Sequence, residues 1–178
     1  MKHVAAVRRS LGVPTIFNLL GPLSNPASAD FQLLGVGKPE LRPLLAAALA
    51  KLEIRRAVVV CGEDGLDEVT IATKTHATLV EGHALRELVW EPGDFGVPTA
   101  SLSALQADGP DASAVMIRDV LAGTPGAARD IVVLNAAAAL WTAGIDEDLT
   151  RCQERVAAAI DSSAAADILA RLGEVSHS

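Results

Sequence analysis

The chain has 178 residues and a formal net charge of −7; half of its residues are hydrophobic, 3% are aromatic and none is tyrosine. This length suffices for one domain with a substantial core. The negative charge and the few aromatic side chains argue against a nucleic-acid surface, which needs a basic face and often stacking platforms.

Neither a secretory signal nor a membrane span is expected. The longest apolar stretch, around residues 131–140, is interrupted by Asn135 and is too short to cross a bilayer. The two cysteines, Cys61 and Cys152, stand far apart, so they form neither a metal knuckle nor a disulfide framework. We interpret both as buried or incidental thiols, and we expect a cytoplasmic protein that binds no membrane.

The first predicted elements are a helix and a shaped loop. Residues 4–11 are typical of the last part of a helix, which Gly12 and Pro14 would end. Residues 8–27 then combine glycine and proline with apolar residues, a composition that disfavours an ordinary helix or a central strand. We expect a loop packed against the core, the kind of segment in which binding residues concentrate.

A strand, a helix and a second strand follow. Residues 31–36 form a short apolar run, and apolar residues recur at helical spacing over residues 39–52. Residues 56–62 are a continuous β-branched run of the kind found in strands buried on both faces of a parallel sheet. The three segments together predict a βαβ unit with a right-handed crossover.

The remainder is predicted to contain further strands and then helices. Residues 70–80 are expected to supply one strand pair and residues 85–91 another, before a loop at residues 92–98. Helices are expected over residues 112–122, 127–143, 148–161 and 163–172. The predicted fold class is therefore α/β, with a mostly parallel central sheet flanked by helices.

The sharpest local signal for chemistry is the pair of acids Asp67 and Glu68. They follow the buried strand and a glycine-rich turn, at residues 62–65, in which Glu63 and Asp64 are interpreted as plain turn residues. The carboxyl end of a parallel strand is where open α/β sheets bind ligands, and adjacent carboxylates can supply hard oxygen ligands to Mg²⁺. From spacing alone, a solvated acidic turn is the simpler interpretation.

Arginine and histidine offer weaker signals. The fork of a guanidinium fits a carboxylate through two parallel hydrogen bonds, so Arg8 or Arg9 could hold an acidic substrate or could be a solvated helix-end charge. The histidines have no ligand spacing and are expected at the surface or with satisfied partners: His3, His76, His83 and His177.

Asn135 is unusual within an alanine-rich helix, because asparagine is a mediocre helix former. We expect it to be structural, with a hydrogen bond to a strand loop.

Residues 8–27 resemble the anthranilate phosphoribosyltransferase family, whose pattern is close to VRR-x-LG-x-x-T-x-FNLLGPL-x-NP. The matching residues are Val7, Arg8, Arg9, Leu11, Gly12, Thr15, Phe17, Asn18, Leu19, Leu20, Gly21, Pro22, Leu23, Asn25 and Pro26. The likeness continues in residues 65–69, in Arg129 and Asp130, and in residues 134–140. One departure is Pro14, where many members have an arginine whose role is lost here.

The resemblance implies transfer of a 5-phosphoribosyl group from phosphoribosyl pyrophosphate to anthranilate, a step of tryptophan biosynthesis that releases pyrophosphate. It implies that Arg8 contacts the anthranilate carboxylate and that Pro22 lines the anthranilate site. It also implies that Asp67 and Glu68 hold Mg²⁺ on the pyrophosphate. No covalent intermediate or strong general base is implied.

Family members are about twice as long, begin with a helical domain that makes most of their homodimer, and carry a GTGGD-type loop for the phosphates. The sequence shows no such loop. We therefore interpret residues 1–178 as a partial C-terminal α/β catalytic domain of the phosphoribosyltransferase and nucleoside phosphorylase type. A truncation, a mis-assigned start or a split gene would each explain it, and we expect negligible transferase activity from the chain alone.

Three alternatives stay open. The first is a nucleoside phosphorylase-like enzyme of the same fold, although residues 18–26 are closer to the anthranilate enzyme. The second is a non-catalytic relative that binds nucleic acid, against which the net charge of −7 and the intact acidic pair speak. The third is a degenerate fragment without function.

Overall fold

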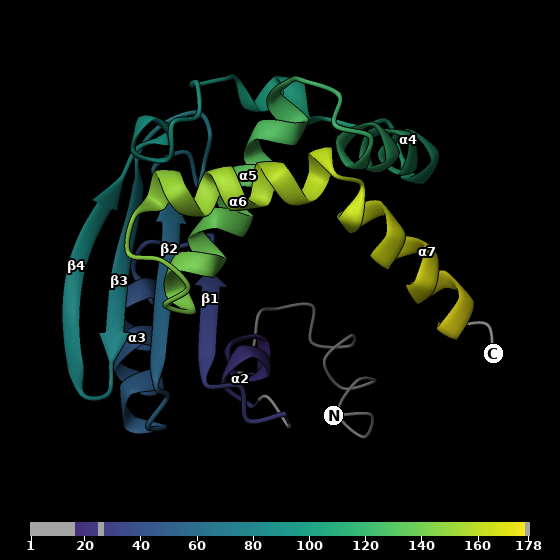
Figure 1. Cartoon of the computed structure of the whole chain (residues 1–178). Helices are drawn as coiled ribbons and strands as arrows, with labels where there is room; N and C mark the ends of the chain where they lie inside the picture. The colour runs from purple at the N-terminus through teal and green to yellow at the C-terminus, as the bar shows by residue number, and fades with distance from the viewer. Residues whose placement is uncertain (1–16, 25–26, 177–178) are drawn as a thin grey trace, which may run out of the picture.

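The computed structural model describes residues 17–24 and 27–176. Its first half contains α2 (Phe17–Leu23), β1 (Phe31–Gly35), α3 (Leu41–Lys51), β2 (Arg56–Gly62), β3 (Thr75–Glu81) and β4 (Ala84–Trp90). Its second half contains the 3₁₀ turns η2 (Pro92–Phe95) and η3 (Leu102–Leu105) and the helices α4 (Pro110–Leu121), α5 (Ala127–Thr142), α6 (Leu149–Asp161) and α7 (Ala164–Ser176) (Figure 1). The expected helices from residue 39 onward are confirmed to within a few residues, whereas the helix expected over residues 4–11 lies outside the described residues.

The sheet has the strand order β1-β2-β3-β4, and only β1 and β2 are parallel. The expectation of a mostly parallel sheet is therefore wrong, because β2 with β3 and β3 with β4 are antiparallel. The cause lies in the connections. Helix α3 returns the chain to the starting edge of the sheet between β1 and β2, whereas no helix intervenes between β2 and β3.

The expectation of a strand pair over residues 70–80 is also wrong. That segment contains one strand, β3, which pairs with β4 across a tight turn in which Gly82 has a φ of 57°. Residues 70–74 stay outside the sheet, because the backbone N–H of Thr70 donates to Thr75 Oγ1 at 3.0 Å rather than to a neighbouring strand.

The loop expected over residues 8–27 contains the seven-residue helix α2, with Pro22 inside it. A helix of only seven residues is possible here because Pro22, which lacks an N–H, removes a single intrahelical hydrogen bond. The chain then turns, with Ser24 N donating to Gly21 O at 3.2 Å, and Gln32 Nε2 of β1 donates to Pro22 O at 3.0 Å. Residues 8–16 lie outside the described residues.

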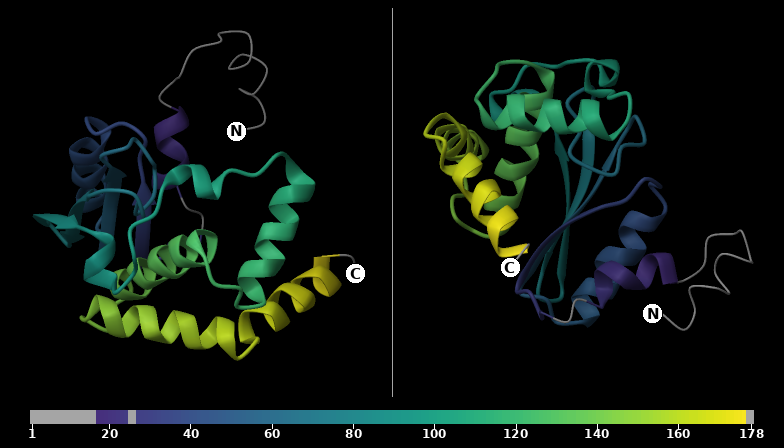
Figure 2. Two further views of the ribbon diagram at one scale, coloured as in Figure 1. Left: turned by 90° about the horizontal axis from the view of Figure 1, so that it is seen from above. Right: turned by 90° about the vertical axis from the view of Figure 1, so that its right-hand side faces the viewer.

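Strand β2 lies between two layers of helices, as its continuous apolar run predicted. Its side chains alternate between two buried clusters: Ala57, Val59 and Cys61 pack with α3, whereas Val58 and Val60 pack with α5. Figure 2 shows α3 on one side of the sheet and α5 and α6 on the other. The core is therefore divided by the sheet, and β2 contributes to both halves.

Helices α4 and α7 project beyond the β1 side of the molecule (Figure 1). Only Val120 of α4 is buried, and no residue of α7 is. Within the part of the chain that the structure describes, no helix combines the length and the apolar character needed to cross a membrane.

Candidate functional site

The loops that follow the two parallel strands lie against each other. A Cβ placed on Gly35, the last residue of β1, would sit 1.6 Å from the carbonyl oxygen of Asp67. A Cβ on Gly37 would sit 3.5 Å from the carbonyl oxygen of Gly65. This is the edge where open α/β sheets bind ligands. Sequence reasoning did not single out Gly35, although a glycine within an apolar strand can mark such a close approach.

The 63–74 loop, which joins β2 to β3, is folded largely by its own side chains. Asp64 Oδ1 accepts from Leu66 N at 3.0 Å, and Asp64 Oδ2 accepts from Thr70 Oγ1 at 2.5 Å. The Thr70 hydroxyl oxygen in turn accepts from Ala72 N at 3.0 Å. Asp64 is thus used within the turn, as expected, and its carboxylate is not free for a ligand.

Asn135 of α5 joins this loop to the helical layer. Its Oδ1 accepts from Val69 N at 2.9 Å, and its Nδ2 donates to Val69 O at 2.9 Å. Nδ2 also donates to Ile131 O, one turn earlier in α5, at 3.1 Å. The expected hydrogen bond from Asn135 to a strand loop is therefore confirmed, and it lies directly beside Glu68.

Asp67 and Glu68 are exposed at the top of this loop. Among the described residues, neither carboxylate accepts a hydrogen bond or forms an ion pair, and no cluster of three or more metal-ligating side chains occurs. Two free carboxylates suit Mg²⁺, which binds one or two protein carboxylates and completes its shell with water and phosphate oxygens. The donor set therefore fits a magnesium ion held jointly with an anionic ligand.

An apolar cavity of about 370 Å³ adjoins the acidic pair. Leu66 and Glu68 form its loop side, and the remaining lining comes from η3, α4 and α5. Those residues are Leu105, Met116, Ile117, Val120, Leu121, Ala128, Ile131 and Val132. Glu68 is the one carboxylate among the residues that line this cavity.

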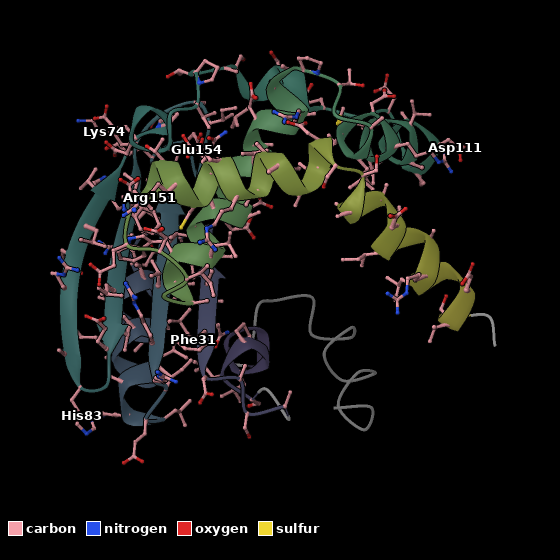
Figure 3. The ribbon with its side chains drawn as sticks, viewed as in Figure 1. Phe31, Lys74, His83, Asp111, Arg151 and Glu154 are labelled. Atoms are coloured by element: carbon pink, nitrogen blue, oxygen red, sulfur yellow. The ribbon has the colours of Figure 1, made fainter. Side chains whose placement is uncertain are left out.

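Pro22 lies at the other end of β1. It lines a separate cavity of about 300 Å³ with Gln32, Leu49, Ile54 and neighbours, and neither Asp67 nor Glu68 takes part. The four residue steps of β1 span about 13 Å. Figure 3 shows Phe31, the first residue of β1, towards the opposite end of the sheet from Lys74, the last residue of the 63–74 loop.

The structure thus does not bring Pro22 together with the Asp67/Glu68 pair. Arg8 and Arg9 lie outside the described residues.

The remaining titratable side chains near the loop have structural partners. His76 Nε2 lies 2.9 Å from Glu63 Oε1, and Thr73 Oγ1 donates to Glu63 Oε2 at 3.3 Å. Cys61 is buried at the end of β2, and burial raises the pKa of its thiol. Burial likewise raises the pKa of the Cys152 thiol in α6, so both cysteines are buried thiols as expected.

Comparison with known proteins shows the family to which this fold and the 63–74 loop belong. The chain belongs to the glycosyl transferase family, whose a/b domain model matches residues 1–166. Within that class it is homologous to anthranilate phosphoribosyltransferases. The enzyme of Rhodospirillum rubrum is 50% identical over 172 residues, which make up 97% of this chain and 50% of that protein. The enzyme of Rhodopirellula baltica is 46% identical over 98% of this chain and 51% of its own length.

Solved structures agree with the sequence comparison. Anthranilate phosphoribosyltransferase from Thermus thermophilus has a TM-score of 0.85 and 38% identity, covering 96% of this chain and 50% of that one. The Saccharomyces cerevisiae enzyme in complex with PRPP and Mg has a TM-score of 0.82 and 30% identity, covering 92% and 47%. The chain therefore spans about half the length of the relatives it matches.

Proposed function

We propose that this chain forms the metal-binding part of an active site that transfers the 5-phosphoribosyl group of phosphoribosyl pyrophosphate to anthranilate. The products would be N-(5-phosphoribosyl)anthranilate and pyrophosphate, and residues 1–178 would act as a partial catalytic domain. The observation that carries the proposal is the exposed, unpaired Asp67/Glu68 pair at the carboxyl edge of the parallel strands. The yeast relative solved with PRPP and Mg supports the choice of ligand.

The chemistry asks for a stabilised leaving group and well-placed substrates. The aniline nitrogen of anthranilate is a poor nucleophile, so the bond from ribose C1 to pyrophosphate must be well broken before attack. Bound Mg²⁺ would neutralise charge on the phosphate oxygens. The task of Asp67 and Glu68 is to hold that ion at a fixed place, and a loop already folded by its own hydrogen bonds does so without reorganisation.

For the acceptor substrate, we propose that Arg8 binds the anthranilate carboxylate, because a guanidinium can form two parallel hydrogen bonds with it. Pro22 is proposed to line the same site. Pro22 is the least supported member, because it lies at the end of β1 away from the acidic pair. We further propose that the assembled enzyme is a homodimer.

A chimera tests the function. This chain would replace the matching half of the Rhodospirillum rubrum enzyme, and turnover would be followed by the loss of anthranilate fluorescence. We expect turnover that requires both phosphoribosyl pyrophosphate and Mg²⁺. The chain assayed alone gives the baseline, where we expect negligible turnover.

Within the chimera, Asp67→Asn combined with Glu68→Gln should lower Mg²⁺-dependent turnover by more than about a hundredfold, because the loss of partners outside the direct ligands already costs about 10- to 100-fold. The control is Asp111→Asn with Glu154→Gln, which makes the same change in charge at two exposed sites on α4 and α6 and should leave turnover unchanged. An unaltered rate and metal dependence in the first variant would remove the pair from the site. Phosphorolysis of ribosides without anthranilate transfer would instead favour the nucleoside phosphorylase alternative.

A further inference from the structure

The residue after Glu68 is held by a side chain from another layer of the fold. The N–H and the C=O of Val69 are both bonded to the carboxamide of Asn135, each at 2.9 Å. A carboxamide carries its acceptor oxygen and its donor nitrogen on the same carbon, so it replaces the two bonds that a neighbouring strand would have given to this residue. The Val69 side chain is itself 1% exposed, which ties the residue into the core.

Asn135 is in turn held rigidly. Its neighbours Val133 and Leu134 and, one turn on, Ala138 are all buried, so α5 cannot rotate or slide without disturbing the core. The third bond, from Nδ2 to Ile131 O, orients the carboxamide plane. The side chain therefore presents its two polar atoms to the 63–74 loop in one fixed arrangement.

The loop is confined from the opposite direction by β1. The carbonyl of Asp67 lies where any side chain on Gly35 would be, so the backbone is in contact with the strand at that residue. Asp67 thus touches β1 on one side, Val69 is bonded to α5 on the other, and Glu68 stands between them. Both carboxylates project from a backbone that is fixed at two points.

We propose that Asn135 is a positioning residue, whose carboxamide sets the place and spacing of the Asp67 and Glu68 carboxylates for the divalent cation. The inference rests on the proposed metal role of that pair. Asn135 does not touch the ion; it acts through the Val69 backbone. Partners of this kind, outside the direct ligands, change metal affinity by about 10- to 100-fold when they are lost.

The test uses the 178-residue chain with Mn²⁺ as the probe. In Asn135→Ser the hydroxyl can still donate to Ile131 O in the same helix but is too short to reach Val69, so this variant isolates the two cross-layer bonds. In metal-free protein we expect the Val69 amide to exchange with solvent at least about tenfold faster. We expect the Mn²⁺ dissociation constant, measured by paramagnetic broadening of loop amide signals, to rise about tenfold.

Thr142→Val is the matched control. It removes a buried hydroxyl of the same helix, one that donates to Ala138 O at 2.7 Å and forms no hydrogen bond with the described 63–74 loop. It should alter neither Val69 exchange nor Mn²⁺ affinity. If Asn135→Ser does not fold, Asn135→Leu, which keeps the number of side-chain heavy atoms and favours the helix, is expected to give the same two effects.

Each outcome decides the matter. Faster exchange and weaker Mn²⁺ binding in the Asn135 variants alone would support the proposal. Unchanged Mn²⁺ affinity, or an equal loss in Thr142→Val, would show that Asn135 serves general stability and would overturn it. Wild-type Mn²⁺ binding by Asp67→Asn with Glu68→Gln would refute the metal site itself, and the positioning role with it.

Discussion

Two regions of the molecule differ in how firmly they are packed: the 63–74 loop, and the pair of helices α4 and α7. The loop has no regular backbone structure, yet Val69, Thr70 and Ile71 are at most 1% exposed. The two helices are fully regular, yet α7 buries no residue and α4 buries only Val120. Regular hydrogen bonding satisfies a helix internally but does not fix where the helix lies. Position comes from burial and from bonds that cross between elements.

The same contrast appears in the side chains that each region exposes. The apolar residues Ile168 and Leu172 of α7 are 65% and 62% exposed, respectively. The loop instead exposes its carboxylates and keeps the side chains of Val69 and Ile71 in the core. A site that binds an ion needs this second arrangement, because free charges must be presented on a backbone that does not move.

The largest expected effect contrasts one leucine from each type of environment. Leu134 of α5 is 0% exposed beside the loop anchor, whereas Leu172 of α7 is mostly exposed. Leu134→Ala should lower the free energy of unfolding by about 3 kcal/mol, through lost burial and the cavity that remains. Leu172→Ala should change it by less than about 0.5 kcal/mol. Urea unfolding of both variants measures the difference, and similar losses would show that α7 is packed far more firmly than its exposure indicates.

Sequence reasoning succeeded where a pattern has one physical cause. The β-branched run of β2 and the helical spacing of α3 and α5 follow from burial, and each matches the structure. The prediction of the strand directions is wrong, because the direction of a strand depends on whether a helix precedes it. The prediction of a strand in the threonine-rich segment before β3 is wrong, because the polar groups of that segment bond to side chains. The prediction of a loop at residues 17–23 is wrong because one proline removes only one hydrogen bond, and its presence therefore does not exclude a short helix.

The candidate site divides in the same way. Asp67 and Glu68 are visible in the sequence because they follow a buried strand. The contact between Gly35 and Asp67 is not, because it joins residues that are distant in the chain. Asn135 stands out in an alanine-rich helix, so a hydrogen bond from its side chain could be expected. The sequence does not indicate that its partner is Val69.

A second experiment adds one methyl group on the β1 side of the loop. Gly35→Ala would place a carbon 1.6 Å from the carbonyl oxygen of Asp67, so the strand or the loop must shift. We expect a loss of about 2 kcal/mol, as for other overpacked sites, together with faster amide exchange in the loop. Gly93→Ala is the control, because a Cβ there meets nothing within 4 Å. Equal, small effects in both variants would mean that β1 does not constrain the loop.

The smallest effect is expected in a second loop, which is also held by hydrogen bonds to an aspartate carboxylate. Between α5 and α6, Asp146 Oδ1 accepts from Asp148 N at 3.0 Å and lies 3.2 Å from Arg151 Nη2. The hydrogen bond from the Asp148 backbone, with the nearby Arg151 charge, holds the pKa of the Asp146 carboxyl below its ordinary value of 3.8. Because the pKa is lowered in the folded state, the charged carboxylate stabilises the fold when the pH lies above the ordinary pKa. This contribution disappears as the pH falls through the lower pKa of the folded state.

Asp146→Asn keeps an oxygen for the Asp148 N–H but removes the charge. The variant should therefore be slightly less stable than wild type near neutral pH, and the two urea midpoints should converge as the pH falls below 3.8. Glu147→Gln is the matched control: it makes the same charge change next to Asp146, at an exposed side chain for which the described structure shows no hydrogen bond or ion pair, and it should leave the urea midpoint near neutral pH unchanged. If the urea midpoints of Asp146→Asn and wild type differ by the same amount down to low pH, this turn depends on the shape of the side chain and not on its charge. This loop would then differ from the 63–74 loop, where the Asp64 carboxylate accepts hydrogen bonds from a threonine as well as from the backbone.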